Sequence, residues 1–227
     1  MRRGGAGIVR DEQGRSIDPG RGLYHARRAA ALSGVPLRTL HHWAQSGFFR
    51  PSVSPDPRDY LWSWGDLLAL RAIDWVRRRK DNPGVPHASL NAIRSALAAL
   101  EQAGLPRHAL RELSIGPDGS LYIDDADGQP VRADASRQVA MFGTLNLVSA
   151  YNGRGPDLLR PRPLVRISPG KLHGEPYVVR TRIPTAVLFE LHREGYDADQ
   201  IRRMYPDVSV EALGQAVELE RSFGGVA

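Results

Sequence analysis

The order of apolar and polar residues changes twice along the chain. In residues 24–103 apolar side chains recur mostly at spacings of three and four, which is typical of helices with one buried face. Between residues 112 and 133 the spacing shortens to two, as in strands, and from residue 185 the helical spacing returns. The pattern predicts a mainly α protein with a small β-rich middle.

Two short helices are expected near the N-terminus, over Ala26–Ser33 and Leu37–Ser46. Gly34 can adopt the left-handed conformation that ends the first of them. Pro36 suits the first turn of the second, where its missing N–H is not needed. A loop, a short strand and a long helix follow, and Ser63 is a favoured N-cap residue for that long helix.

A further helix is expected over His87–Ala103, and four of its apolar residues share one face: Leu90, Ile93, Leu97 and Leu100. An apolar stripe of this kind needs to be buried against another surface in the folded protein. It predicts either a homodimer that pairs two copies through this helix or burial of the stripe against the β-rich middle.

The β-rich middle contains a hairpin signal. Glu112–Ile115 and Leu121–Ile123 flank the turn sequence Gly116–Gly119, and Pro130–Ala133 is a candidate third strand. The C-terminal part predicts three short helices that depend on packing against one another: Thr185–Arg193, Asp199–Met204 and Val210–Arg221.

Breaks in composition divide the chain further. They predict a flexible arm (1–21), a helical head (22–82), a dimer helix (83–110), a hairpin-containing middle (111–150), a linker (151–163) and a C-terminal helical domain (164–227). Because the Gly-, Pro- and Arg-rich linker would separate the last domain from the rest, that domain is expected to be dispensable for anything the head does.

Composition narrows the function classes. The chain has 227 residues, no cysteine and a formal net charge of +6, and its only lysines are Lys80 and Lys171. Its positive charge is therefore almost all arginine, which suits phosphate binding but also follows from a GC-rich genome. Absence of cysteine excludes disulfides and zinc fingers, and no apolar run is long enough to span a membrane. A cytoplasmic protein is expected.

No catalytic or metal-binding constellation emerges. The seven histidines lack the spacing of joint metal ligands, and the adjacent His41 and His42 would point about 100° apart on a helix. The acidic run Asp124–Gly128 fits a hairpin turn better than a calcium loop, because the closing glutamate is missing. We expect no enzyme activity, no metal and no cofactor.

The helix over Leu37–Ser46 divides its side chains between two faces. Leu40, Trp43 and Ala44 form the apolar face, and polar residues form the opposite one. A DNA-recognition helix needs this division, because one face anchors it and the other contacts base edges and phosphates. The candidate DNA-binding residues, including two arginines of the following loop, are Arg38, Thr39, His41, His42, Gln45, Arg50 and Arg58. The alternative is an ordinary solvated helix face.

Residues 22–79 resemble the winged helix-turn-helix head of MerR-type regulators. The resemblance rests on Tyr24, Ala29-Ala30, Leu32, Gly34-Val35, Arg38-Thr39-Leu40, Trp43, Gly47, Arg50-Pro51, Ser63, Asp66-Leu67 and Leu70. It implies binding to promoter DNA, by a homodimer that sets two recognition helices about 34 Å apart. His41 and His42 stand where the family normally has Arg and Tyr, so the sequence preference need not follow the family.

The last quarter of the chain resembles a small helical domain, long of unknown function, that occurs in VapB-type antitoxins. The resemblance rests on Gly174, Pro176, Thr181-Arg182-Ile183-Pro184, Leu191, Gly195, Ile201, Tyr205-Pro206, Leu213 and Ala216. Where the family usually has Arg-Gly, this chain has Val179-Arg180. The resemblance implies a PIN-type ribonuclease toxin as partner, encoded nearby. The toxin-binding candidates are Arg180, Thr181 and Arg182, unless this segment is only a solvated edge.

Together the two resemblances imply an antitoxin that neutralises its toxin and binds the promoter of its own operon. One alternative is a MerR-like transcription regulator with a ligand pocket around Tyr122 and Phe142 in the middle region. Another is a protein-interaction adaptor whose head no longer binds DNA.

Overall fold

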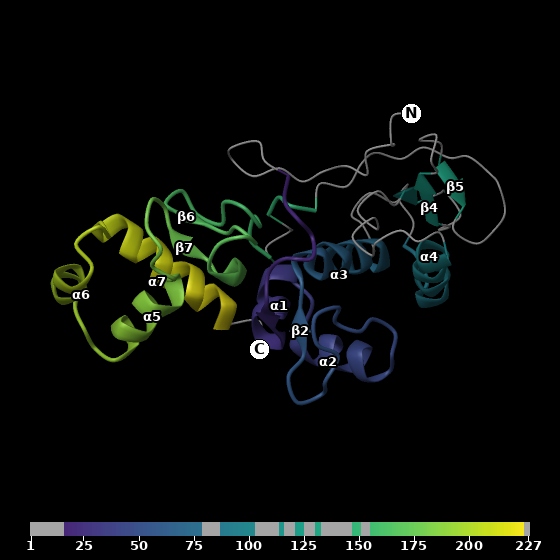
Figure 1. Cartoon of the computed structure of the whole chain (residues 1–227), viewed down its shortest axis with the longest axis horizontal. Coiled ribbons are helices and arrows are strands. Elements are labelled where there is room, and N and C mark those ends of the chain that lie inside the picture. Colours follow the sequence, from purple (N-terminus) through teal and green to yellow (C-terminus); the bar gives the residue numbers. More distant parts are fainter. Residues whose placement is uncertain are drawn as a thin grey trace. The chain divides into compact units, whose positions relative to one another are not determined.

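The computed structural model of the chain describes residues 16–78, 87–102, 114–115, 121–124, 130–132, 147–150 and 155–224. The described part is mainly helical with small antiparallel sheets, as predicted (Figure 1). It divides into two compact units, one within residues 65–147 and the other formed by residues 16–64 together with 148–224. The expected arm lies mostly outside the described residues, as does residue 142.

The N-terminal part of the second unit contains β1 (Tyr24–His25), α1 (Ala26–Ser33), α2 (Leu37–Gln45) and β2 (Leu61–Trp62). Gly34 has φ 76° and donates its N–H to the carbonyl of Ala30 at 2.9 Å, so the predicted left-handed end of α1 is confirmed. Strands β1 and β2 are antiparallel, with Tyr24 opposite Trp62. This pairing ties the start of α1 to the end of the loop that follows α2.

The C-terminal part of the same unit contains β6 (Val165–Arg166), η2 (Leu172–Gly174), β7 (Tyr177–Val178), α5 (Thr185–Arg193), α6 (Ala198–Met204) and α7 (Val210–Gly224). A capping box starts α6, because Asp197 accepts the N–H of Gln200 and the Gln200 side chain accepts the N–H of Asp197. The Ser209 hydroxyl accepts the N–H of Ala212 at 3.1 Å and starts α7.

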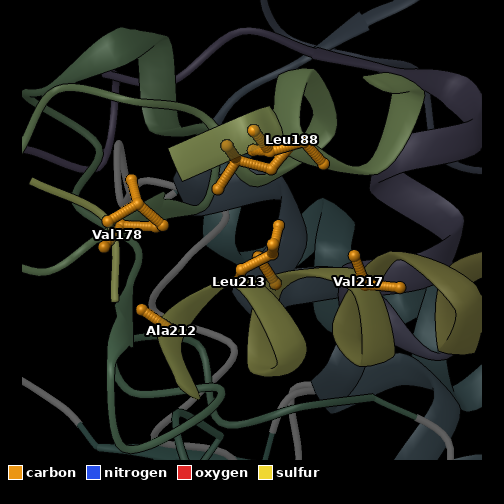
Figure 2. Close-up of a cluster of buried hydrophobic side chains, with 8 residues drawn as sticks. Val178, Leu188, Ala212, Leu213 and Val217 are labelled. Atoms are coloured by element: carbon orange, nitrogen blue, oxygen red, sulfur yellow. The ribbon is translucent and has the colours of Figure 1, made fainter. Parts of the chain in front are cut away.

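The three C-terminal helices enclose one apolar core. Figure 2 shows this core, in which side chains of α5 and α7 face one another beside β7. Its buried members are Val178, Leu188, Ile201, Val208, Ala212, Leu213, Ala216 and Val217. The mutual packing predicted for these short helices is therefore present.

Residues 155–163, which the composition predicts as part of a linker, are packed into the same unit. Leu158 and Pro161 are buried, and the Asp157 carboxylate accepts the N–H groups of Leu159 and Arg160 at 2.8 and 2.6 Å. The head and the C-terminal domain also touch directly, through α1 and α7. The independence expected of the C-terminal domain therefore does not follow from the structure.

The other unit contains α3 (Trp64–Arg77), α4 (Leu90–Gln102) and an antiparallel sheet of β3 (Ser114–Ile115), β4 (Leu121–Asp124) and β5 (Pro130–Arg132). The strands follow one another in the order β3-β4-β5, so the predicted hairpin and its third strand are confirmed. Among the described helices of the chain, none combines the length and hydrophobicity that crossing a lipid bilayer requires.

The stripe on α4 is largely covered within one chain. Ile93 and Leu100 are fully buried and Leu97 is half-buried, whereas Leu90 is exposed. The helix begins three residues later than predicted because the Ser89 hydroxyl accepts the N–H of Ala92 and acts as the N-cap. The stripe therefore does not by itself require a second copy, and the homodimer stays a prediction.

Candidate functional site

Helix α2 has the two faces that its sequence predicts. Leu40, Trp43 and Ala44 are buried, and the opposite face is open to solvent. Four candidate DNA-binding residues are exposed on it, and Thr39 is half-buried: the exposed ones are Arg38, His41, His42 and Gln45. Because α2 contains no acidic residue, this face presents only neutral and basic groups.

Aromatic contacts fix α2 against the loop that follows it. Phe49 stacks on Trp62 of β2 with ring centroids 5.9 Å apart, and Phe48 packs on Trp43 at 5.3 Å. His41 meets the edge of Tyr60 at 6.0 Å. His41 therefore has a structural contact in addition to its exposure, which the sequence pattern did not indicate.

The loop after α2 forms a small hairpin that presents two arginines. Ser54 pairs with Leu61, and Asp56 accepts the N–H of Arg58 at 2.9 Å, so the turn places Arg58 near its tip. Arg50 and Arg58 are both exposed. Among the described residues no carboxylate pairs with Arg58 or with Arg38 of α2. The hairpin and α2 therefore offer unneutralised guanidinium groups on neighbouring elements.

The second candidate, Arg180–Arg182, lies in a tight turn between β7 and α5. Arg180 has φ 63°, so this non-glycine residue occupies the left-handed region that usually favours glycine. Arg180 and Arg182 are exposed. The turn therefore has a left-handed residue without glycine and presents an exposed arginine side chain there.

Thr181, the third toxin-binding candidate, closes this turn with its side chain. Its hydroxyl donates to the carbonyl of Val178 at 2.9 Å and accepts the N–H of Ile183 at 3.0 Å. Its carbonyl accepts the Nζ of Lys171 at 2.7 Å.

Sequence reasoning did not single out Lys171. Its ammonium lies 3.9 Å from the centre of the Tyr177 ring. Burial, together with the nearby positive charge of Arg182, lowers the pKa of Lys171. Lys171 and Arg182 therefore form a local concentration of positive charge at this turn.

A buried ionic cluster, Arg28–Glu175–Glu220, joins the two ends of the unit. The Arg28 guanidinium lies 2.8 Å from Glu175 and 2.9 Å from Glu220, and it stacks over the ring of Phe223. Burial alone would lower the pKa of Arg28, but the two carboxylates outweigh it and hold the pKa above its usual value. The Thr185 hydroxyl adds a 2.5 Å hydrogen bond to Glu220.

Tyr24 lies beside this cluster. Its ring is so close to Gly22 and Gly174, whose φ angles are 85° and 89°, that a side chain at either glycine would collide with it. The N–H of Leu23 donates to the carbonyl of His173 at 2.8 Å. Burial, with a contribution from the charge of Glu175, raises the pKa of the Tyr24 hydroxyl, which has no hydrogen-bond partner among the described residues.

Two other predictions from the sequence concern a metal site and a ligand pocket. No group of three or more acidic or histidine side chains that could hold a metal ion occurs within the described ranges. The alternative ligand pocket rests on the side chains of Tyr122 and Phe142, which lie outside what the structure describes.

Comparison with protein families adds one finding. Residues 165–218 match a family described as a protein of unknown function, DUF433. No curated protein and no solved structure gives a significant match to the chain. The match runs from β6 into α7 and ends before Glu220, so it covers the C-terminal domain and leaves the head without a family assignment.

Proposed function

We propose that this protein is an antitoxin that binds the promoter of its own operon and holds a PIN-type ribonuclease toxin encoded beside it. The observation that carries the DNA-binding half is the exposed, acid-free face of α2 beside the arginine-bearing hairpin. The C-terminal half of the proposal rests on the family match and on the resemblance to VapB-type antitoxins. In this function the chain is not an enzyme and needs no cofactor.

The DNA-binding half follows the winged helix-turn-helix mode. The exposed face of α2 would enter the major groove, where Arg38 and Gln45 can donate to base edges. Arg50 and Arg58 would contact phosphates on the flanking backbone, because an exposed guanidinium suits phosphate oxygens and carries no base preference. His41, held against Tyr60, would mainly set the angle between helix and hairpin.

The test is a titration of the full chain against a labelled fragment of its own promoter, followed by fluorescence anisotropy at several salt concentrations. Arg58→Ala should weaken binding to every sequence and reduce the salt slope by about one unit. Gln45→Ala should instead alter preference among sequences. Arg203→Ala, which removes an exposed arginine from α6, is the matched control and should change neither. A wild-type chain that binds no DNA at low salt would favour the adaptor alternative.

For toxin binding, the proposal places the side chains of Arg180 and Arg182 at the acidic metal site of the nuclease. Both side chains are exposed, and within the described residues neither has a carboxylate partner. A guanidinium placed there would compete with the divalent metal and with RNA phosphates. Co-purification of the toxin with wild type, Arg180→Ala and Arg182→Ala tests this assignment. Undiminished toxin inhibition by both variants would contradict it.

A further inference from the structure

The C-terminal domain has a second surface feature, away from the turn that holds Arg180. An open groove of about 550 Å³ lies between the end of α5, the start of α6 and one side of α7. Leu213, Gly214 and Val217 of α7 line it, together with Tyr196, Val210 and Arg221. Its lining is therefore mainly apolar and belongs to a single compact unit.

Gly214 is the unusual residue of this groove. It lies inside α7, where glycine is less favourable than alanine, and no atom of the chain lies within 4 Å of where its Cβ would stand. The packing of this chain therefore gives no reason for a glycine at this position. Its effect is to leave the backbone of α7 open along the groove.

Two of the apolar residues that line the groove are exposed. The exposed fractions of Tyr196 and Val210 are 41% and 53%, which is high for large apolar side chains. A groove that combines an uncovered helix backbone with exposed apolar side chains is the kind of surface on which another helix can approach closely.

The rim of the groove carries charged residues of both signs. Arg221 contacts His192, with 2.8 Å between Nη2 and Nε2, and no carboxylate pairs with it in the described part of the chain. Of the acidic residues at the rim, Asp197 caps α6 and Glu218 lies 3.7 Å from Arg162, so neither of them pairs with Arg221. An occupant that carries a carboxylate beside apolar side chains would neutralise Arg221.

We propose that this groove receives an amphipathic helix of the partner protein, with its apolar face over Gly214 and an acidic residue at Arg221. The proposal rests on the proposed function and adds a second surface for the toxin, besides the turn that carries Arg180 and Arg182. A second copy fits less well, because no described helix exposes more than one large apolar residue: Leu90 on α4, Val187 on α5, Met204 on α6 and Val210 on α7. Helix-in-groove binding needs such anchors at successive turns.

The first experiment blocks the groove. The full chain is titrated by biolayer interferometry against the PIN-type protein encoded by the adjacent reading frame. Gly214→Leu should weaken the Kd by about 30-fold or more, as filling the centre of an interface does. Arg203→Leu places the same side chain on α6 outside the groove and should leave the Kd unchanged. Because leucine favours helices, the Tm of Gly214→Leu should be no lower than that of wild type.

The second experiment tests the charge. Arg221→Glu should weaken the Kd by about tenfold or more, since it places like charges opposite each other. Arg203→Glu makes the same change of charge outside the groove and should have little effect. A carboxylate-to-lysine change on the partner helix that restores binding to Arg221→Glu would identify the opposing residue.

The outcomes separate the two proposals. If the wild-type chain does not bind the adjacent protein, the proposed function fails and this inference fails with it. If wild type binds and Gly214→Leu binds equally well, only the groove assignment is overturned. Sedimentation velocity of the chain alone covers the remaining case: a wild-type dimer that Gly214→Leu converts to a monomer would make the occupant a second copy and overturn the inference.

Discussion

Removal of the Glu220 carboxylate should destabilise the head and the C-terminal domain together. The exposed fractions of the Arg28 and Glu220 side chains are 15% and 8%, so the pair is largely shielded from water. Glu220→Ala leaves Arg28 with Glu175 alone and takes one acceptor from Thr185. Breaking a buried pair by removing one partner costs about 3 to 5 kcal/mol. Since Glu175 remains, we expect the lower end, about 3 kcal/mol.

Thermal unfolding measures this effect. For a protein of this length, 3 kcal/mol corresponds to a fall in Tm of about 6 to 12 °C. Glu218→Ala is the matched control, because Glu218 lies two residues earlier on α7, is 71% exposed and pairs with Arg162 only at 3.7 Å. Its change in the free energy of unfolding should stay within about 0.5 kcal/mol.

Two further measurements distinguish destabilisation of the head and the C-terminal domain together from destabilisation of one of them alone. The tryptophan fluorescence, to which Trp43 in α2 contributes, and the far-UV circular dichroism of the helices should shift to lower temperature together in Glu220→Ala. The double variant Arg28→Ala/Glu220→Ala should lower the free energy of unfolding by clearly less than the sum of the two single variants, because the two residues share one interaction. Equal Tm values for Glu220→Ala and Glu218→Ala would refute the view that this cluster joins the two ends of the chain.

Three other outcomes are expected. Burial raises the pKa of the Tyr24 hydroxyl above its usual value of 10.0, so the neutral hydroxyl stabilises the folded state fully below pH 10. This contribution to the free energy of unfolding is lost as the pH rises above 10. In an alkaline titration wild type should therefore lose more stability than Tyr24→Phe. Arg180→Gly should raise the free energy of unfolding by about 1 kcal/mol, because it relieves the left-handed backbone, and urea midpoints compared with Arg182→Gly would show whether the gain is specific to residue 180. Asp197→Ala should cost about 1 kcal/mol through loss of the capping box, whereas an equal loss in Asp199→Ala would show that the cap is not the cause.

Local structure was predictable because its causes are local. Gly34 ends α1 where the sequence places that end, and Asp197 begins α6 by capping its first turn. The start of α4 was placed too early because the apolar spacing continues before the cap, and only the hydrogen bond to Ser89 decides between the two positions. Boundaries of this kind depend on one side chain rather than on a repeated pattern.

The buried cluster was not predictable, because its members are far apart in the sequence. Arg28 and Glu220 are separated by 192 positions, and nothing in the pattern around either residue identifies the other. Glu220 reads as an ordinary polar position on an amphipathic helix, although it is buried. The same holds for Lys171, whose role depends on a turn ten residues later. The exposed face of α2 was predictable, since helical spacing alone assigns it.

The contact between Arg28 and Glu220 also determines when, during translation, this unit can complete its folding. The unit that contains the α2 face draws on both ends of the chain, with residues 65–147 inserted between them in the sequence. A ribosome adding about 5 to 20 residues per second needs about 10 to 40 s to travel the 192 positions from Arg28 to Glu220. During that interval α1 and later Glu175 are made, but the cluster stays incomplete until Glu220 is added. The head of a nascent chain therefore reaches its final stability only after Glu220 has been synthesised.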